Sequence, residues 1–258
     1  MKADFAGARS LITTSWDDGH PSDLRVAELL EKHGISGTFY VPTRNAEGRK
    51  VMQPAEVRQV ARRFEIGGHT RDHVSLTDMS LLEAEDQIVS NKSWLEDLLG
   101  QEVSGFAYVR GHHNRMVRQL VRRLGFRYAR TVRNLSASPG MDRFQMPTTM
   151  QFFAHPNAIY LRNCLSGGPS LERVTVLRAV LGGGDLVTRL TRAAETCLGI
   201  AGHFHLWGHS WELEEHQLWD DLDRFLGWLE HLPAGSVPNA GWCIDRAGVA
   251  TRAGRALP

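Results

Sequence analysis

The chain has 258 residues, of which 42% are hydrophobic and 23% are charged, as is usual for a globular protein and unusual for a disordered or fibrous one. Its 30 basic and 29 acidic side chains leave a formal charge of +1, so no global electric field attracts nucleic acid or an anionic membrane. No apolar run approaches the ~20 residues of a membrane-spanning helix. These numbers predict a globular protein with no nucleic-acid partner and no membrane span.

The cytoplasm is the expected compartment. Residues 1–19 lack the apolar segment of a signal peptide. Cys164, Cys197 and Cys243 are odd in number and far apart in the sequence, which matches neither a disulfide framework nor a zinc–thiolate site.

Short apolar runs alternate with helical patterns along most of the chain. In chain order we predict strand 10–16, helix 22–33, strand 36–42, a helix from Pro54, strand 64–68, helix 80–99, strand 104–109, helix 114–124, strand 126–132, helix 185–198, strand 202–208, helix 213–230 and a last strand at 241–244. The clearest helix signal is the capping box of Ser80 and Glu83. Residues 134–169 have weak periodicity with several prolines and glycines, and there we predict long loops with one or two short strands.

Repeated strand–helix units predict an α/β protein with a mostly parallel sheet. About six or seven units are enough to close a barrel. No linker or internal repeat divides the sequence, so residues 1–258 are predicted to form a single domain. In parallel barrels the catalytic side chains lie where strands end and loops begin, and polar clusters follow three of the predicted strands.

The first cluster is Asp17 and Asp18, which follow the first strand and precede Gly19. A turn at the glycine brings both carboxylates to one site, and two close carboxylates are costly unless a cation or a proton is shared. The alternative is a solvated turn that caps the next helix, and this short motif alone does not decide between them.

The second cluster is His69 and His73, which follow strand 64–68. Histidines at i and i+4 share one face if the loop takes a helical turn, and such a pair can hold a metal. The alternative is a surface loop with two unrelated histidines.

The third cluster lies in strand 202–208 and just after it. His203 and His205 share one face of this strand, whereas His209 follows Gly208 at its end. A core histidine satisfied by backbone groups explains one of these side chains, but not three of them beside Trp207.

Together the clusters indicate metal-dependent hydrolysis. One aspartate and two histidines are a common ligand set for a catalytic zinc or a similar divalent ion. A second carboxylate beside them can act as the general base, and a histidine from the opposite side as the general acid.

Three segments, TSWDDGHPSD, GGHTRDHVSLT and HLWGHS, resemble motifs of the polysaccharide deacetylase family, in the family's order and between residue 11 and about residue 215. The resemblance implies a distorted (β/α) barrel of about seven parallel strands and a metal-dependent N-deacetylase. It implies Asp18, His69 and His73 as ligands of a divalent ion, with zinc as the first choice and cobalt, nickel, manganese or iron as alternatives. It also implies Asp17 as the general base and His209 as the general acid, with His205 as the rival acid.

One motif departs from the family pattern. The family has a proline and a tyrosine in its third motif, where this chain has Val109 and Arg110. The resemblance makes the backbone N–H of Arg110 the analogue of the family's oxyanion donor. The family's arginine that steadies the base has no match in this segment, so Arg130 is our candidate, and the alternative is an ordinary surface arginine.

Residues at the predicted strand ends suggest the substrate. Arg110, Arg130 and Arg133 are placed to meet an anionic group. Tryptophan faces stack on sugar rings, although tryptophan is also an ordinary core residue. The predicted substrate contacts are Trp16, Arg110, His205, Trp207 and Trp211.

A cytoplasmic deacetylase does not reach polymers of the cell wall, so we expect a small acylated amino sugar as substrate. One alternative is an amidohydrolase that acts on a ureide, an imide or a formamide. Another is a sugar-binding relative without activity, against which the presence of Asp17, His69, His73 and His209 argues. The preferred metal and the oligomeric state cannot be predicted from the sequence.

Overall fold

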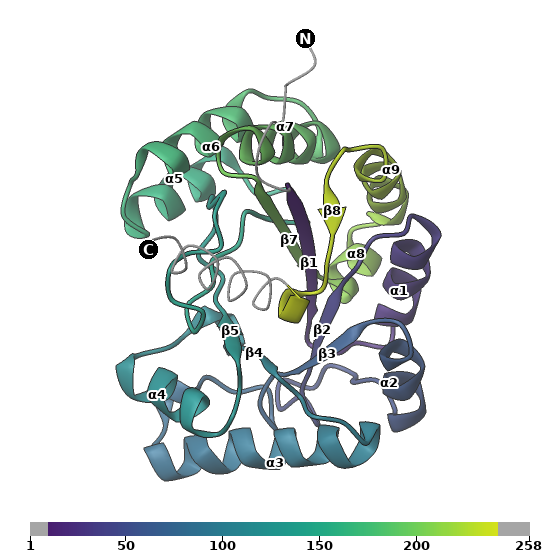
Figure 1. The fold of residues 1–258 in the computed structure, drawn as a ribbon, viewed down its shortest axis with the longest axis vertical. Coiled ribbons are helices and arrows are strands. Elements are labelled where there is room, and N and C mark those ends of the chain that lie inside the picture. Colours follow the sequence, from purple (N-terminus) through teal and green to yellow (C-terminus); the bar gives the residue numbers. More distant parts are fainter. Residues whose placement is uncertain (1–9, 242–258) are drawn as a thin grey trace, which may run out of the picture.

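The computed structural model describes residues 10–241 of the chain. Its centre is an eight-stranded sheet with the strand order β5-β4-β3-β2-β1-β7-β6, and β8 pairs with β1. All of these strand pairs are parallel. The sheet curls on itself, and a ring of helices surrounds it (Figure 1). The fold confirms the predicted single-domain, distorted (β/α) barrel.

The strands differ in length, and the longest two, β1 and β7, are neighbours in the sheet. The strands are β1 (Leu11–Asp17), β2 (Thr38–Val41), β3 (Glu65–Gly68), β4 (Gly105–Ala107), β5 (Tyr128–Arg130), β6 (Met150–Gln151), β7 (His203–His209) and β8 (Gly235–Ser236). β1 and β7 pair over their full lengths, so Asp17 lies directly beside His209. Almost every residue of these two strands is buried, as expected for parallel strands covered on both faces.

The outer layer consists of α1 (Asp23–Lys32), α2 (Pro54–Ala61), α3 (Leu81–Leu99), α4 (Arg115–Arg123), α5 (Asn157–Ser166), α6 (Leu171–Leu181), α7 (Leu186–Ile200), α8 (Ser210–Glu215) and α9 (Trp219–Leu229), with the short 3₁₀ turns η1 (Leu76–Asp78) and η2 (Val109–Gly111). The predicted capping box of α3 is present, since Ser80 accepts from the Glu83 N–H and Glu83 accepts from the Ser80 N–H. None of the described helices is both long and apolar enough to cross a membrane.

The segment between β5 and β6 joins the two edges of the sheet. Met146 forms a parallel bridge with Arg130 of β5. Three residues later, the N–H of Thr149 donates to the carbonyl of His205 in β7 over 3.0 Å. This stretch of chain therefore contacts the edge strand β5 and also β7, the second strand from the other edge, and bridges the gap between them.

The structure differs from the predicted elements by one divided helix and by additional elements, among them α5 and β8. The long helix predicted at 213–230 is two helices, α8 and α9, because the chain turns at Gln217, whose φ is 54°. β8 was not predicted, and the strand predicted at 241–244 lies, apart from Gly241, outside the described residues. Residues 134–169 contain β6, as predicted, but also the helix α5.

A buried arginine organises the region that contains α5. The guanidinium of Arg173, in α6, donates to the backbone carbonyls of Asn134, Asn163, Cys164 and Gly168 over 2.8–3.2 Å. These contacts fasten the end of α5 and the loop after β5 to α6. The loop and helix that lie beside the site are thus held by a polar anchor rather than by an apolar stripe.

Candidate active site

The polar clusters meet at the carboxyl edge of the sheet because all of its strands run in the same direction. Asp17 is the last residue of β1, and Asp18 follows it. His69 follows β3, and His209 is the last residue of β7. His73 lies on the loop after β3. The structure therefore brings together the five residues that the sequence predicted as base, metal ligands and acid.

Asp18, His69 and His73 form a group whose ligand atoms all lie within 4.8 Å of one another. The Oδ1 atom of Asp18 is 2.9 Å from Nε2 of His73 and 3.5 Å from Nε2 of His69. The Nδ1–H of His69 donates to the carbonyl of Ala107 over 2.9 Å, which fixes the ring so that Nε2 faces Asp18. A carboxylate and two imidazoles presented in this way fit a divalent ion such as zinc.

The backbone around this group takes unusual conformations. Asp18, Thr70 and His73 have φ values of 77°, 67° and 55°, in the left-handed region where a residue other than glycine costs ~1–3 kcal/mol. The loop is held by Asn91 of α3, whose Oδ1 accepts from the His69 N–H over 2.9 Å and whose Nδ2 donates to the Val41 carbonyl over 3.0 Å. The fold thus imposes strained backbone where the three ligand side chains have to converge.

The two adjacent aspartates have different surroundings. Burial opposes the charge of Asp18, but hydrogen bonds from His69 and His73 outweigh it and lower the pKa of Asp18 below its usual range. Burial instead raises the pKa of Asp17. Oδ1 of Asp17 is buried and has no hydrogen-bond partner among the described residues. Asp18 is therefore engaged in hydrogen bonds with His69 and His73, whereas Oδ1 of Asp17 is available to accept a proton.

His209 stands on the other side of the group. Its Nε2 atom is 3.9 Å from Oδ2 of Asp18, and its Nδ1 atom is 2.9 Å from Oε2 of Glu212. The ring stacks on Trp211, with 5.2 Å between centroids, and meets the Trp207 ring edge-on at 5.3 Å. Burial opposes protonation, but the hydrogen bond with Glu212 and the charge of Asp18 raise the pKa of His209 to about 9. The imidazole is therefore fixed in orientation and held protonated at neutral pH.

His205 lies inside the barrel. Its Nδ1 is 2.7 Å from the Thr13 hydroxyl and its Nε2 is 3.1 Å from the Ser15 hydroxyl. The side chain is fully buried, and burial together with the charge of Arg130 lowers its pKa well below the usual value. His205 is consequently neutral and has both ring nitrogens engaged.

Two of the predicted substrate contacts are not exposed at the site. Trp16 and His205 are both 0% exposed. Trp16 belongs to the apolar core and lies against Gly208 of β7. The structure therefore does not place either side chain where a substrate could touch it.

The other predicted contacts lie at the edge of the barrel. Nε1 of Trp211 donates to Oδ2 of Asp18 over 2.8 Å, and the Arg49 guanidinium covers its ring at 3.4 Å. Arg110 is exposed on η2, has a φ of 55°, and pairs with Glu47 over 2.6 Å. Trp207 is almost buried and lines a cavity beside the site.

Arg130 points into the barrel below the site. Its guanidinium donates to the carbonyl of Pro147 over 2.7 Å and to Oδ1 of Asn239 over 2.6 Å. It also lies 3.4 Å from the hydroxyl of Thr13. Arg130 and Asp17 line the same small cavity. A role of Arg130 in orienting the base therefore stays a prediction.

Two residues near His209 were not singled out as functional from the sequence. One is Glu212, although its i+3 spacing from His209 is a usable signal in the sequence. Gln151 donates through Nε2 to Oε2 of Glu212 over 2.8 Å and lies 2.9 Å from Nε2 of His155 through Oε1. Nothing in the sequence marks Gln151, because it lies in the region without periodicity.

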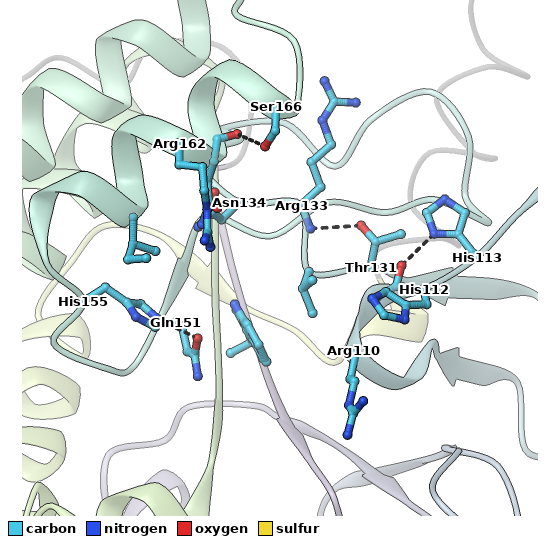
Figure 2. Close-up of a pocket in the computed structure, with 16 residues that line it drawn as sticks. Arg110, His112, His113, Thr131, Arg133, Asn134, Gln151, His155, Arg162 and Ser166 are labelled. Atoms are coloured by element: carbon cyan, nitrogen blue, oxygen red, sulfur yellow. Dashed lines mark hydrogen bonds between the residues drawn. The ribbon is translucent and has the colours of Figure 1, made fainter. Parts of the chain in front are cut away.

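Beside this group lies a cavity of about 550 Å³. Its walls come from η2, the loop after β5, β6 with the loop that follows it, and α5. Figure 2 shows Arg162, Gln151 and His155 on one side and Arg110, His112 and His113 on the other.

Comparisons with known proteins agree with this geometry. Residues 6–129 match the family model described as polysaccharide deacetylase. A search of curated proteins found no match.

Solved structures are similar to this chain at low sequence identity, and the first two described here share its fold. A candidate polysaccharide deacetylase from Mycobacterium smegmatis is 17% identical, with a TM-score of 0.62 over 98% of this chain and 94% of that one. A family 4 acetyl xylan esterase from Clostridium thermocellum, in complex with a cobalt ion, is 14% identical, with a TM-score of 0.58 over 92% of each chain. The Streptococcus pyogenes deacetylase PplD, in complex with acetate, is 20% identical, with a TM-score of 0.49 over 52% of this chain. This chain covers 62% of PplD, less than two thirds of its length.

Proposed function

The chain belongs to the polysaccharide deacetylase family through residues 6–129, and on this premise we propose that it is a metal-dependent hydrolase that removes the N-acetyl group from a small molecule containing an amino sugar. One observation carries the proposal. The converging group of Asp18, His69 and His73 lies near a carboxylate with an unengaged oxygen, Asp17, and near a histidine whose pKa is raised, His209.

Asp18, His69 and His73 are the residues that would hold the metal. A divalent ion bound there supplies Lewis-acid activation of the amide carbonyl and of the attacking water. Zinc is our first choice because it accepts one carboxylate and two imidazoles, with cobalt, nickel, manganese or iron as alternatives.

Asp17 is the proposed general base. Its Oδ1 atom is buried and without a hydrogen-bond partner among the described residues, so it can accept the proton of the attacking water without breaking an existing contact. Burial also raises its pKa, which makes it a stronger base than an exposed aspartate. Arg130, which lines the same small cavity, is the proposed positioning residue for this base.

His209 is the proposed general acid. Glu212 accepts the hydrogen bond from Nδ1–H, so Nε2–H remains available on the side of Asp18. Its proton passes to the departing amine nitrogen, which is a poor leaving group without protonation. The backbone N–H of Arg110, in its left-handed turn, is the proposed donor to the oxyanion.

The proposed substrate is a small N-acetylated amino sugar, which we expect in the cytoplasm. Trp207 and Trp211 flank His209 and offer aromatic surface for a sugar ring. An amidohydrolase acting on a ureide or a formamide has the same catalytic groups, so the released product distinguishes the two reactions.

The test joins metal analysis to product analysis. The purified protein is assayed for bound metal and for acetate, formate and ammonia released from N-acetylated amino sugars. We expect stoichiometric metal and acetate release, both lost in the His69→Ala, His73→Ala double variant and both retained in His231→Ala, whose side chain is 81% exposed at the end of α9. Metal bound at unchanged affinity in the double variant would contradict the ligand assignment, and release of formate or ammonia would contradict the reaction.

A further inference from the structure

The cavity beside the active site is strongly basic. Its lining contains Arg110, Arg133, Arg162, His112, His113 and His155, and no aspartate or glutamate. In Figure 2 Arg162 and His155, from α5 and the loop before it, stand on one side, and Arg110, His112 and His113, from η2 and the segment after it, stand on the other. Arg133, from the loop after β5, lies between them. The basic groups thus come from separate segments of the chain that the fold brings around one volume.

Of the three arginines that line the cavity, one forms an internal ion pair within the described residues and two do not. Arg110 pairs with Glu47 over 2.6 Å. Arg133 and Arg162 are exposed, and within residues 10–241 neither guanidinium has an acidic partner. Like charges gathered without counter-charges repel one another, so an anion from solution removes an existing electrostatic cost when it enters.

The cavity is continuous with the surroundings of the catalytic base. Thr131, Val132 and Trp207 line both this cavity and the small cavity that contains Asp17. On its other side, Gln151 lines the cavity and donates to Glu212, the partner of His209. A molecule in the cavity therefore lies next to the groups that act on the amide.

We propose that this cavity binds the phosphate or carboxylate group of the substrate, so that the substrate is an anionic N-acylated amino sugar rather than a neutral one. The hydrolysis of the N-acyl group rests on the proposed function, whereas the binding of the anion does not. Guanidinium groups bind both kinds of oxyanion through paired hydrogen bonds. A volume of about 550 Å³ lies within the range of small-molecule sites, ~300–1,000 Å³.

The experiment compares three probes with the metal-loaded protein. N-acetylglucosamine 1-phosphate and N-acetylmuramic acid carry the two anions, and methyl N-acetylglucosaminide is the neutral reference. Binding is measured by calorimetry and acetate release by product assay. The variant is Arg133→Gln, Arg162→Gln, and the matched control is Arg178→Gln, an exposed arginine of α6 that does not line the cavity.

We expect the wild-type protein to bind at least one anionic probe more tightly than the neutral probe. The double variant should lower the affinity for that anion about tenfold or more relative to the neutral probe, and Arg178→Gln should leave both affinities unchanged. The anion that loses affinity identifies the group the cavity accepts.

Equal affinity for anionic and neutral probes in the wild-type protein overturns the proposal. So does unchanged anion affinity in the double variant. If the anions bind in an arginine-dependent way but no probe releases acetate, the anion site stands and the proposed deacetylation fails, so the two failures are distinguishable.

Discussion

The two sides of the site differ in how deeply their side chains are buried and in whether those side chains have partners of opposite charge. On the metal side, Asp18, His69 and His73 are between 2% and 6% exposed and touch one another. On the cavity side, Arg133 and Arg162 are exposed and lack acidic partners in the described part of the chain. Groups that act on a reacting bond benefit from a dry, preorganised setting, whereas groups that recognise a substrate must exchange water for it. The difference supports the proposal that catalysis and substrate recognition use different segments of this barrel.

Altering the two adjacent aspartates separately tests whether one binds the metal and the other acts as the base. We expect Asp18→Asn to lose metal and to reduce acetate release by ~10³-fold or more, because removing one partner breaks the ligand set. Asp17→Asn should keep its metal and lose ~10²-fold or more in kcat, the scale of a general base. Metal analysis with initial rates measures both.

The two variants are each other's control, since each exchanges one buried carboxylate for an amide at neighbouring positions. If Asp17→Asn loses the metal while Asp18→Asn keeps it, the roles of the two carboxylates are reversed.

A second comparison separates His205 and His209, two of the three histidines of β7. His209→Ala should lower kcat by ~10²-fold or more with metal content unchanged, and the fall in rate at high pH should disappear. His205→Ala should instead lower stability by ~1–3 kcal/mol, because the hydroxyls of Thr13 and Ser15 lose a buried partner. Rate–pH profiles and thermal unfolding of both variants give the answer. A high-pH limb that survives in His209→Ala and vanishes in His205→Ala would mean that His205 is the acid.

A third and smaller change concerns the partner of the acid. The hydrogen bond with Glu212 helps to raise the pKa of His209 to about 9. His209 acts while protonated, so the rate falls as pH rises through its pKa. In Glu212→Gln the raised pKa drops, and the high-pH limb should move to lower pH by about one unit or more, while the rate near pH 6 changes less. The matched control is Glu214→Gln, because Glu214 is an exposed neighbour that accepts a hydrogen bond from Trp219. If the high-pH limb does not move in Glu212→Gln, the Glu212 carboxylate does not raise the pKa of His209.

The smallest expected effect tests the cavity side without any substitution. If Arg133 and Arg162 meet an anion at the exposed rim, added salt screens that attraction. Between ~50 and ~500 mM sodium chloride, KM for an anionic substrate should rise about two- to fivefold while kcat stays constant. The neutral methyl glycoside should show no such rise. A salt-independent KM for the anion contradicts the exposed cationic contact.

The metal side was predictable from the sequence because its signals are local. Asp17 and Asp18 precede Gly19, and His69 and His73 are four residues apart. Each pair follows a strand whose apolar run is short and clear. Parallel strands place these loops at the same edge, so local spacing was sufficient to predict which residues meet.

The cavity side was predictable only in part. Arg110 and Arg133, which the sequence analysis expected to meet an anion, do line the cavity, but the rest of the lining depends on contacts distant in sequence. α5 buries only Tyr160 and Cys164, which leaves almost no helical periodicity. α6 buries Arg173, a charged residue that interrupts an amphipathic pattern. The placement of Gln151 against Glu212 joins residues 61 positions apart. Propensity and periodicity do not encode such contacts, whereas the folded barrel does.

The most direct test of the central claim is a metal titration of the metal-free protein, with bound metal and acetate release followed in the same samples. The protein should release no acetate at first, regain activity in proportion to zinc up to one equivalent, and gain nothing beyond it, while Asp17→Asn binds the same equivalent and releases no acetate. Acetate release at the full rate before metal is added, or activity that does not follow metal bound through Asp18, His69 and His73, would contradict a metal-dependent deacetylase.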